Sequence, residues 1–117
     1  MALAFARAGL ALVSVICDLD SIKPAVSRRI RCQEADPELL FFDFINEIIF
    51  LISSQGMLFS RIEVTINGPF LEAILDGEAI DPMRHDPAVE IKGASFNSLS
   101  VTRDKDGQWI ARCVVDV

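Results

Sequence analysis

The sequence predicts an α+β fold, because two helical segments are combined with strands that pair through short turns. Residues 2–17 and 37–54 have the apolar spacing of helices. Asn67-Gly68 separates two strand-like runs and is a strong hairpin signal. A second hairpin is expected over residues 89–117, turning at Asp104–Gly107.

The totals predict one folded domain covering residues 1–117. Hydrophobic residues make up 51% of the chain and low-complexity tracts are absent, so a soluble domain is expected. The net charge is −6, whereas general nucleic-acid binders carry a basic face. The charge therefore argues against that class, but it leaves open a partner that itself holds RNA.

The three cysteines, Cys17, Cys32 and Cys113, have no CxxC spacing, and we expect reduced, buried thiols. The apolar run from Leu10 to Ile16 lacks the small-residue cleavage site of a signal peptide. No stretch reaches the roughly 20 apolar residues of a membrane span. A cytoplasmic protein with no membrane partner is predicted.

Residues 2–17 are rich in Ala and Leu and lack proline, which favours a helix with Phe5, Leu12 and Ile16 on one face. The run Asp18–Ser21 ends it. Neither an N-cap nor a strand precedes this helix, so we interpret it as an element whose beginning is missing.

A half-exposed strand close to a sheet edge is predicted over residues 25–33. Its arginines, Arg28, Arg29 and Arg31, are either a phosphate-binding patch or a solvated strand face. The acidic total charge favours the solvated face.

The second helix has clear end signals. Asp36-Pro37-Glu38 supplies an N-cap, a proline at the first helical position and an acid in the first turn, and Gly56 is the stop. Because apolar residues cover most of its circumference, it is the predicted central core element. Its polar stripe contains Asp43 and Glu47, which form either half of a metal site or, as favoured here, a solvated face.

The only histidine, His85, lies in a proline-rich loop after the Asn67-Gly68 hairpin. The spacing suggests no nucleophile or second ligand beside it. A hydrogen-bonding role in the loop is therefore favoured over catalysis or metal binding, which both stay open. Together with Lys92, His85 is kept as a candidate functional or partner-contacting residue.

The final hairpin carries the remaining candidate site residues. Lys92 looks buried, and the apolar alternation changes phase at Gly93-Ala94, where a β-bulge would re-aim the lysine side chain. An exposed strand lysine is the alternative. Asp116 shares a face with Arg112 and precedes the terminal carboxylate of Val117. It is expected to pair with Arg112 or to bind a hard cation together with the terminus.

Several enzyme classes find no support, because P-loop, dinucleotide-binding and serine-hydrolase motifs are absent. No set of three nitrogen or sulfur donors suits zinc. The residues alone therefore predict an α+β domain with a candidate acidic site at its C-terminus.

Several segments covering nearly the whole chain carry a family resemblance: Phe5 through Asp18-Leu19-Asp20, Leu58-Phe59-Ser60-Arg61, Arg84-His85-Asp86-Pro87 with Glu90-Ile91-Lys92-Gly93-Ala94, and Asp106-Gly107-Gln108-Trp109 to Val114-Val115-Asp116-Val117. Together they resemble archease. The resemblance implies two helices packed on a mixed, mainly antiparallel sheet. It also implies a non-catalytic accessory protein that promotes guanylylation and turnover of an RtcB-type RNA ligase in tRNA splicing or RNA repair, meeting RNA only through the ligase.

The resemblance further implies a divalent-cation site, usually described as calcium, to which Asp116 and Val117 would contribute. It assigns functional importance to Lys92, although Gly93 and Ser95 depart from the family pattern. Archeases begin with a strand carrying an H-x-A-D motif that supplies another metal-ligand aspartate, and this sequence starts inside the first helix. We therefore expect an incomplete cation site and an unpaired position in the sheet. An in-frame H-x-A-D upstream of Met1 would explain the difference.

Two other functions stay open. A chaperone or adaptor for RNA-modifying enzymes would dock a basic partner on the acidic surface. A small metal-dependent hydrolase would need His85 and Asp116 to reach one substrate together. The oligomeric state and the identity of the cation are not predicted.

Overall fold

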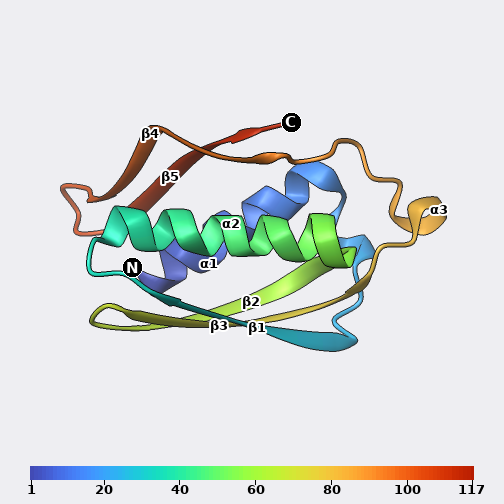
Figure 1. Ribbon diagram of the computed structural model, residues 1–117, viewed down its shortest axis with the longest axis horizontal. Coiled ribbons are helices and arrows are strands. Elements are labelled where there is room, and N and C mark those ends of the chain that lie inside the picture. The colour runs from blue at the N-terminus through green and yellow to red at the C-terminus, as the bar shows by residue number, and fades with distance from the viewer.

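The computed structural model describes residues 1–117 and places two helices between two antiparallel sheets (Figure 1). In chain order the elements are α1 (Ala2–Ile16), η1 (Leu19–Ser21), β1 (Val26–Gln33), α2 (Pro37–Gln55), β2 (Met57–Asn67), β3 (Phe70–Ala79), α3 (Pro82–His85), β4 (Gly93–Arg103) and β5 (Trp109–Asp116). The α+β class is confirmed. The expected single mixed sheet is instead two sheets, ordered β1-β3-β2 and β4-β5, in which every pairing is antiparallel. No helix is both long enough and apolar enough to cross a membrane.

Helix α1 packs closely on β2 because one of its core-facing residues is glycine. A Cβ atom on Gly9 would lie 2.8 Å from Cδ1 of Ile62 and 3.0 Å from Cδ1 of Ile48. Phe5 and Val13 are fully buried on the same helix. The predicted helix is therefore confirmed, and its small residue sets the distance between α1 and the core.

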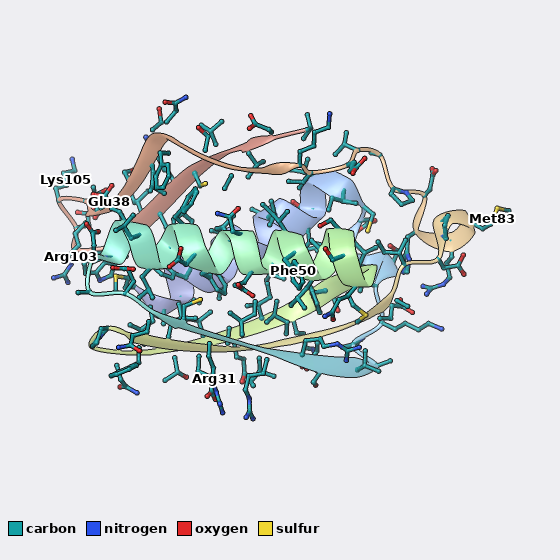
Figure 2. The ribbon with its side chains drawn as sticks, viewed as in Figure 1. Arg31, Glu38, Phe50, Met83, Arg103 and Lys105 are labelled. Carbon is teal, nitrogen blue, oxygen red and sulfur yellow. The ribbon has the colours of Figure 1, made fainter.

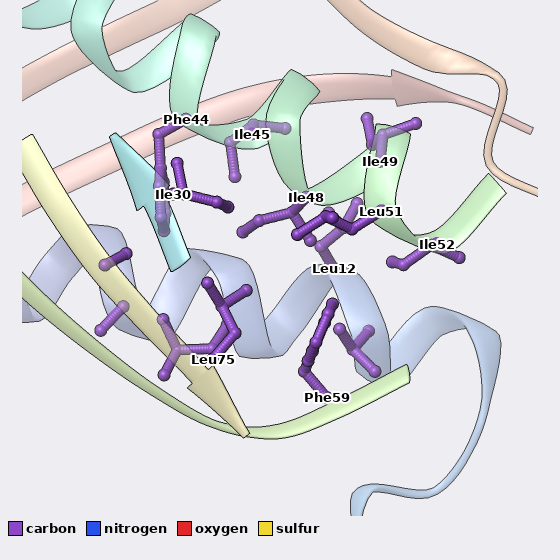
Figure 3. Packing of buried hydrophobic residues seen from close by; sticks show 14 of the residues in the cluster. Leu12, Ile30, Phe44, Ile45, Ile48, Ile49, Leu51, Ile52, Phe59 and Leu75 are labelled. Atoms are coloured by element: carbon purple, nitrogen blue, oxygen red, sulfur yellow. The ribbon is translucent and has the colours of Figure 1, made fainter. Parts of the chain in front are cut away.

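The end signals of α2 act as predicted. The Asp36 side chain accepts a hydrogen bond of 2.8 Å from the Glu38 backbone N–H, and Gly56 adopts φ = 63° at the C-cap. The helix buries Phe41 and Phe44 against Phe5, with ring centroids 4.9 Å and 6.0 Å from that of Phe5. Buried side chains of α2, Phe44 and Ile48 among them, reach towards α1 and the three-stranded sheet (Figure 3). On its other side the helix packs against β4.

The three-stranded sheet turns its charged face to solvent. The predicted β2–β3 hairpin forms, with Gly68 and Pro69 as the turn between the paired residues Asn67 and Phe70. β1 is an edge strand, also as predicted. Nε of Arg31 lies 3.2 Å from a Glu72 carboxylate oxygen, and Arg31 points away from the sheet (Figure 2). Arg29 lies 4.0 Å from the same carboxylate. These partners favour the solvated strand face over a phosphate patch.

The prediction of a β-bulge at Gly93-Ala94 is wrong in position. Gly93 pairs with Asp116 and Ala94 with Val115 in regular register, and the irregularity falls between Ser95 and Ser100. Within that segment Ser98 has φ = 58°. Phe96 lies in the same segment, which has no register partners on β5. Its ring stacks on Phe42 of α2 with centroids 4.1 Å apart. The apolar phase therefore changes later than the sequence pattern suggested.

Candidate functional site

The β4–β5 hairpin brings the start of its first strand beside the end of the chain. Gly93 is the register partner of Asp116, and the Lys92 backbone N–H donates a 2.7 Å hydrogen bond to the Asp116 carbonyl oxygen. Backbone pairing thus places Lys92, Asp116 and Val117 next to one another. We call these three residues the tail site.

The side chains of the tail site are accessible. Lys92 is exposed, so the expectation of a buried lysine is wrong. The reason is that β4 begins only at Gly93, and Ile91 is the residue that enters the core there. Asp116 is also exposed, and Val117 is 63% exposed. An ammonium group, a side-chain carboxylate and the terminal carboxylate are therefore open to solvent at one end of the hairpin.

Asp116 does not pair with Arg112. The ion pairs of the chain involve neither residue. Residues four apart in a strand share a face, but they are separated by about 13 Å at the usual rise per residue. The sequence pattern correctly placed Arg112 and Asp116 on one face of the strand, but it carried no information on the distance between them.

The tail site does not form a complete cation site from this chain's own groups. It offers the Asp116 and terminal carboxylates, whereas calcium takes roughly six to eight oxygen ligands. No group of three or more His, Cys, Asp or Glu side chains lies close enough together to hold a metal ion. Asp43 and Glu47 likewise gain no third ligand. Asp116 and Val117 stay predicted contributors to a cation site.

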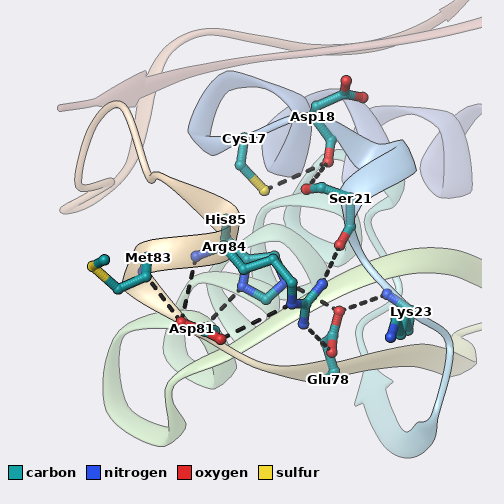
Figure 4. A network of polar contacts seen from close by, with 9 residues as sticks. All are labelled: Cys17, Asp18, Ser21, Lys23, Glu78, Asp81, Met83, Arg84 and His85. Carbon is teal, nitrogen blue, oxygen red and sulfur yellow. Dashed lines mark hydrogen bonds and ion pairs between the residues drawn. The ribbon is translucent and has the colours of Figure 1, made fainter.

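His85 belongs to a separate polar network that joins β3, α3 and η1 (Figure 4). Its side chain is fully buried. Nδ1 accepts a 2.9 Å hydrogen bond from the Asp81 backbone N–H, so the neutral ring carries its proton on Nε2, which lies 3.0 Å from a Glu78 oxygen. Both ring nitrogens are engaged within the fold. The geometry agrees with the predicted hydrogen-bonding role and leaves neither nitrogen for a substrate.

Glu78 is the centre of this network. Its carboxylate accepts hydrogen bonds from the Arg84 guanidinium and, at 2.7 Å, from the Lys23 backbone N–H. The Arg84 guanidinium also donates to the Ser21 carbonyl oxygen at 2.7 Å. Chiefly through the Arg84 hydrogen bond, the pKa of Glu78 is lowered to about 2. The network therefore fastens the loop after β3 to the segment after α1.

Sequence reasoning missed Glu78 and Arg84. Glu78 meets Lys23 across 55 positions of sequence, and Arg84 meets Ser21 across 63. No local pattern signals such contacts. The only available sign was an acidic residue shortly before the proline-rich loop and a basic residue within it.

The cysteines are free, as predicted. Cys17 is buried, whereas Cys32 and Cys113 are half-buried. Burial, followed by the carboxylates of Glu47 and Asp43, raises the pKa of the Cys32 thiol to about 11. This thiol is therefore protonated and unreactive at neutral pH.

The Glu78→Gln variant is expected to be less stable than the wild type at neutral pH and to lose an acid-sensitive component of stability. The pKa of folded Glu78 lies below the ordinary carboxyl value of 4.5. Its stabilising contribution is therefore present above that pH and is lost as the pH falls towards about 2. Urea midpoints measured across this range should converge for wild type and variant. Glu63→Gln, an exposed change on β2, is the control and should leave the midpoint unchanged. A wild-type advantage that persists undiminished at low pH would contradict the assignment.

Comparisons with known proteins agree on one family. The model of the archease protein family matches residues 1–117. A Thermococcus kodakarensis protein archease is 31% identical over 118 residues, an alignment that covers 97% of this chain and 83% of the relative. A Methanopyrus kandleri protein archease is 35% identical over 115 residues, covering 95% and 81%.

Solved structures show the same fold. The solution structure of Methanobacterium thermoautotrophicum protein 1598 has a TM-score of 0.80 and 28% identity, covering 96% of this chain and 81% of that chain. A Thermotoga maritima crystal structure, described as an archease and possible chaperone, has a TM-score of 0.61 and 20% identity, covering 95% and 79%. The second likeness concerns the fold alone.

Proposed function

Because this chain belongs to the archease family, we propose that it is a non-catalytic, cytoplasmic accessory protein that activates an RtcB-type RNA ligase. It would promote guanylylation and turnover of the ligase during tRNA splicing or RNA repair. Contact with RNA would then come through the ligase, in keeping with the net charge of −6.

The observation that carries this proposal is the tail site. Lys92, Asp116 and the terminal carboxylate are held together by backbone pairing, and none of them is used in an ion pair of the chain. Charged groups that are exposed, carried on paired backbone and free of internal ion pairs are suited to contact another protein. A divalent cation, calcium in this proposal, would take Asp116 and Val117 as part of its ligand set, with the other ligands supplied from outside these residues.

Adding the protein to an RtcB-type ligase is expected to raise guanylylation and multiple-turnover RNA sealing. Lys92→Ala and Asp116→Ala should each reduce the stimulation by about tenfold or more, equivalent to about 1.4 kcal/mol. Because both side chains are exposed, thermal unfolding followed by circular dichroism should be unchanged. The measurements are the guanylylation rate and the sealing rate at saturating accessory protein.

Lys105→Ala and Asp106→Ala are matched controls. They remove the same charges from exposed positions in the turn of the same hairpin, between the end of β4 and the start of β5. Figure 2 labels Lys105 at this turn. Both should retain full stimulation. Wild-type protein that leaves guanylylation unchanged at saturation, or controls that fail as badly as the tail variants, would refute the proposal.

A second candidate function is a chaperone or adaptor for RNA-modifying enzymes. It is favoured by the acidic net charge, which suits a basic enzyme as the partner. This function predicts protection of a basic enzyme from aggregation, measured by light scattering. Protection should weaken at high salt, because screening reduces attraction between opposite surface charges. Equal protection by wild type and Asp116→Ala would separate it from ligase activation.

A further inference from the structure

The outer face of the three-stranded sheet carries a cavity at the end where the β2–β3 hairpin turns. Its volume is about 600 Å³, which is within the usual range of small-molecule sites. We call it the hairpin-end cavity. It is separate from the tail site, which belongs to the β4–β5 sheet. The solvent-facing residues of its lining come from all three strands: Arg31 and Gln33 from β1, Thr65 and Asn67 from β2, and Phe70 and Glu72 from β3.

Strand pairing places an aromatic ring between two carboxamides in this cavity. Gln33 and Asn67 are both register partners of Phe70, so one amide side chain lies on each side of the ring. Phe70 is 56% exposed and stacks on no other ring of the chain. Neither carboxamide forms a side-chain hydrogen bond within the fold. The ring and both amides are therefore available to a ligand.

The charges of the lining neutralise each other. Arg31 and Thr65 are both register partners of Glu72, and Nε of Arg31 lies 3.2 Å from the Glu72 carboxylate. Single-stranded nucleic acids are bound along a positively charged groove that follows their phosphates. Because the one arginine of this lining is already paired, the cavity has no free positive charge for a chain of phosphates. The ligand is therefore recognised through neutral groups.

An exposed ring beside free carboxamides suits a flat ligand with a polar edge. Aromatic side chains bind nucleobases by stacking. A glutamine or asparagine side chain matches the edge of adenine, because its NH₂ group donates to N7 and its oxygen accepts from the N6 amino group. A peptide that extends a sheet needs a free strand edge, whereas this cavity lies on a sheet face with β3 in the middle. The chemistry of the lining therefore favours an adenine base.

We propose that the hairpin-end cavity binds one adenine nucleoside. Its base stacks on Phe70, and the Gln33 carboxamide, which is longer than that of Asn67, bonds to N6 and N7 of the base. The single exposed ring of the lining serves a single base. Any phosphate on the nucleoside stays in solvent, since Arg31 is paired with Glu72. This inference does not depend on the tail site or on ligase activation.

The test is a titration of the full chain with adenosine, followed by two-dimensional NMR, which detects weak binding. We expect saturable shifts at the side-chain amide signals of Gln33 and Asn67 and at backbone amides around Phe70. One stacked base with two hydrogen bonds corresponds to a dissociation constant of about 1 mM. Adenosine monophosphate should bind within about twofold of adenosine. Purine riboside, which lacks the N6 amino group, should bind more weakly than adenosine.

Variants assign the contacts to individual side chains. Phe70→Ala should weaken adenosine binding about tenfold or more, and Phe70→Trp should preserve it, because both large rings stack on a base. Gln33→Met keeps the length of the side chain and removes the amide, so adenosine should then bind no better than purine riboside. Phe50→Ala is the matched control, because it removes another half-exposed ring that lies on α2 outside the cavity, and it should bind normally.

Four outcomes would overturn the proposal. The first is the absence of saturable shifts, and the second is a Phe70→Ala variant that binds adenosine as the wild type does. The third is equal binding of adenosine and purine riboside, which would show that the base edge is not read. The fourth is a short oligoadenylate that binds more than about tenfold tighter per base than adenosine, because the occupant would then be a single-stranded RNA.

Discussion

Gly77→Ala is expected to destabilise the domain by about 3–4 kcal/mol, a large share of the stability of a typical small domain. A Cβ atom at this position would lie 1.8 Å from the carbonyl oxygen of Leu58 and 2.8 Å from Cα of Phe59. These are backbone atoms, which cannot rotate away as a flexible side chain would. Gly77 pairs with Phe59 beside the register shift of β2, so the strands must separate there to admit a methyl group. Urea unfolding followed by far-ultraviolet circular dichroism measures the loss.

Gly93→Ala is the matched control for this prediction. Both glycines lie in strands, and neither needs a positive φ. No atom lies within 4 Å of a Cβ placed on Gly93, so the change should be neutral or stabilising by less than about 1 kcal/mol. A small loss at Gly77, or an equal loss at both positions, would show that the close approach of β2 and β3 relaxes without cost.

Elements whose signals are local were predicted well. The Asp36 cap and the left-handed Gly56 set the ends of α2. Gly68, with φ = 58°, sets the β2–β3 turn between the paired residues Asn67 and Phe70, because few residues other than glycine and asparagine tolerate the backbone angles of a tight hairpin. These structures depend on residues within a few positions of one another, so the sequence alone contains their cause.

Features that depend on register or on distant contacts were predicted less well. Strand periodicity specifies which face a side chain occupies, but it does not give the register or the distance along the strand. The Arg112–Asp116 pair, which was one of the two roles left open for Asp116, and the bulge expected at Gly93-Ala94 are both absent for this reason. The division into two sheets also escaped prediction, since it follows from how the helices fill the space between the strands.

In the candidate site, too, some features were predicted from the sequence and others were not. The grouping of Lys92 with Asp116 was expected from the family resemblance and from a hairpin that ends the chain, and β4–β5 pairing brings their backbones together. The burial of Lys92 was wrong, because it depends on where β4 begins. Glu78 became visible only when the fold brought Lys23 and Arg84 to it.

Phe44→Ala is expected to cost about 3–5 kcal/mol, because it removes a fully buried ring from the contact between the two helices. The ring centroid lies 6.0 Å from that of Phe5, and both rings are completely buried between the sheets. The cavity would open where α1 meets α2, so α1 should loosen first. Urea unfolding gives the free energy, and hydrogen exchange at α1 amides locates the local loss.

Phe50→Ala separates burial from other effects of the substitution. Phe50 lies on the same helix and loses the same ring atoms with the same gain in helix propensity, but it is 51% exposed (Figure 2). Its replacement should cost less than about 1 kcal/mol. The difference between the two variants therefore measures what packing between α1 and α2 contributes. If the two losses were equal, the interior of this domain would be held mainly by its sheets, and α1 would be a dispensable cover rather than part of the core.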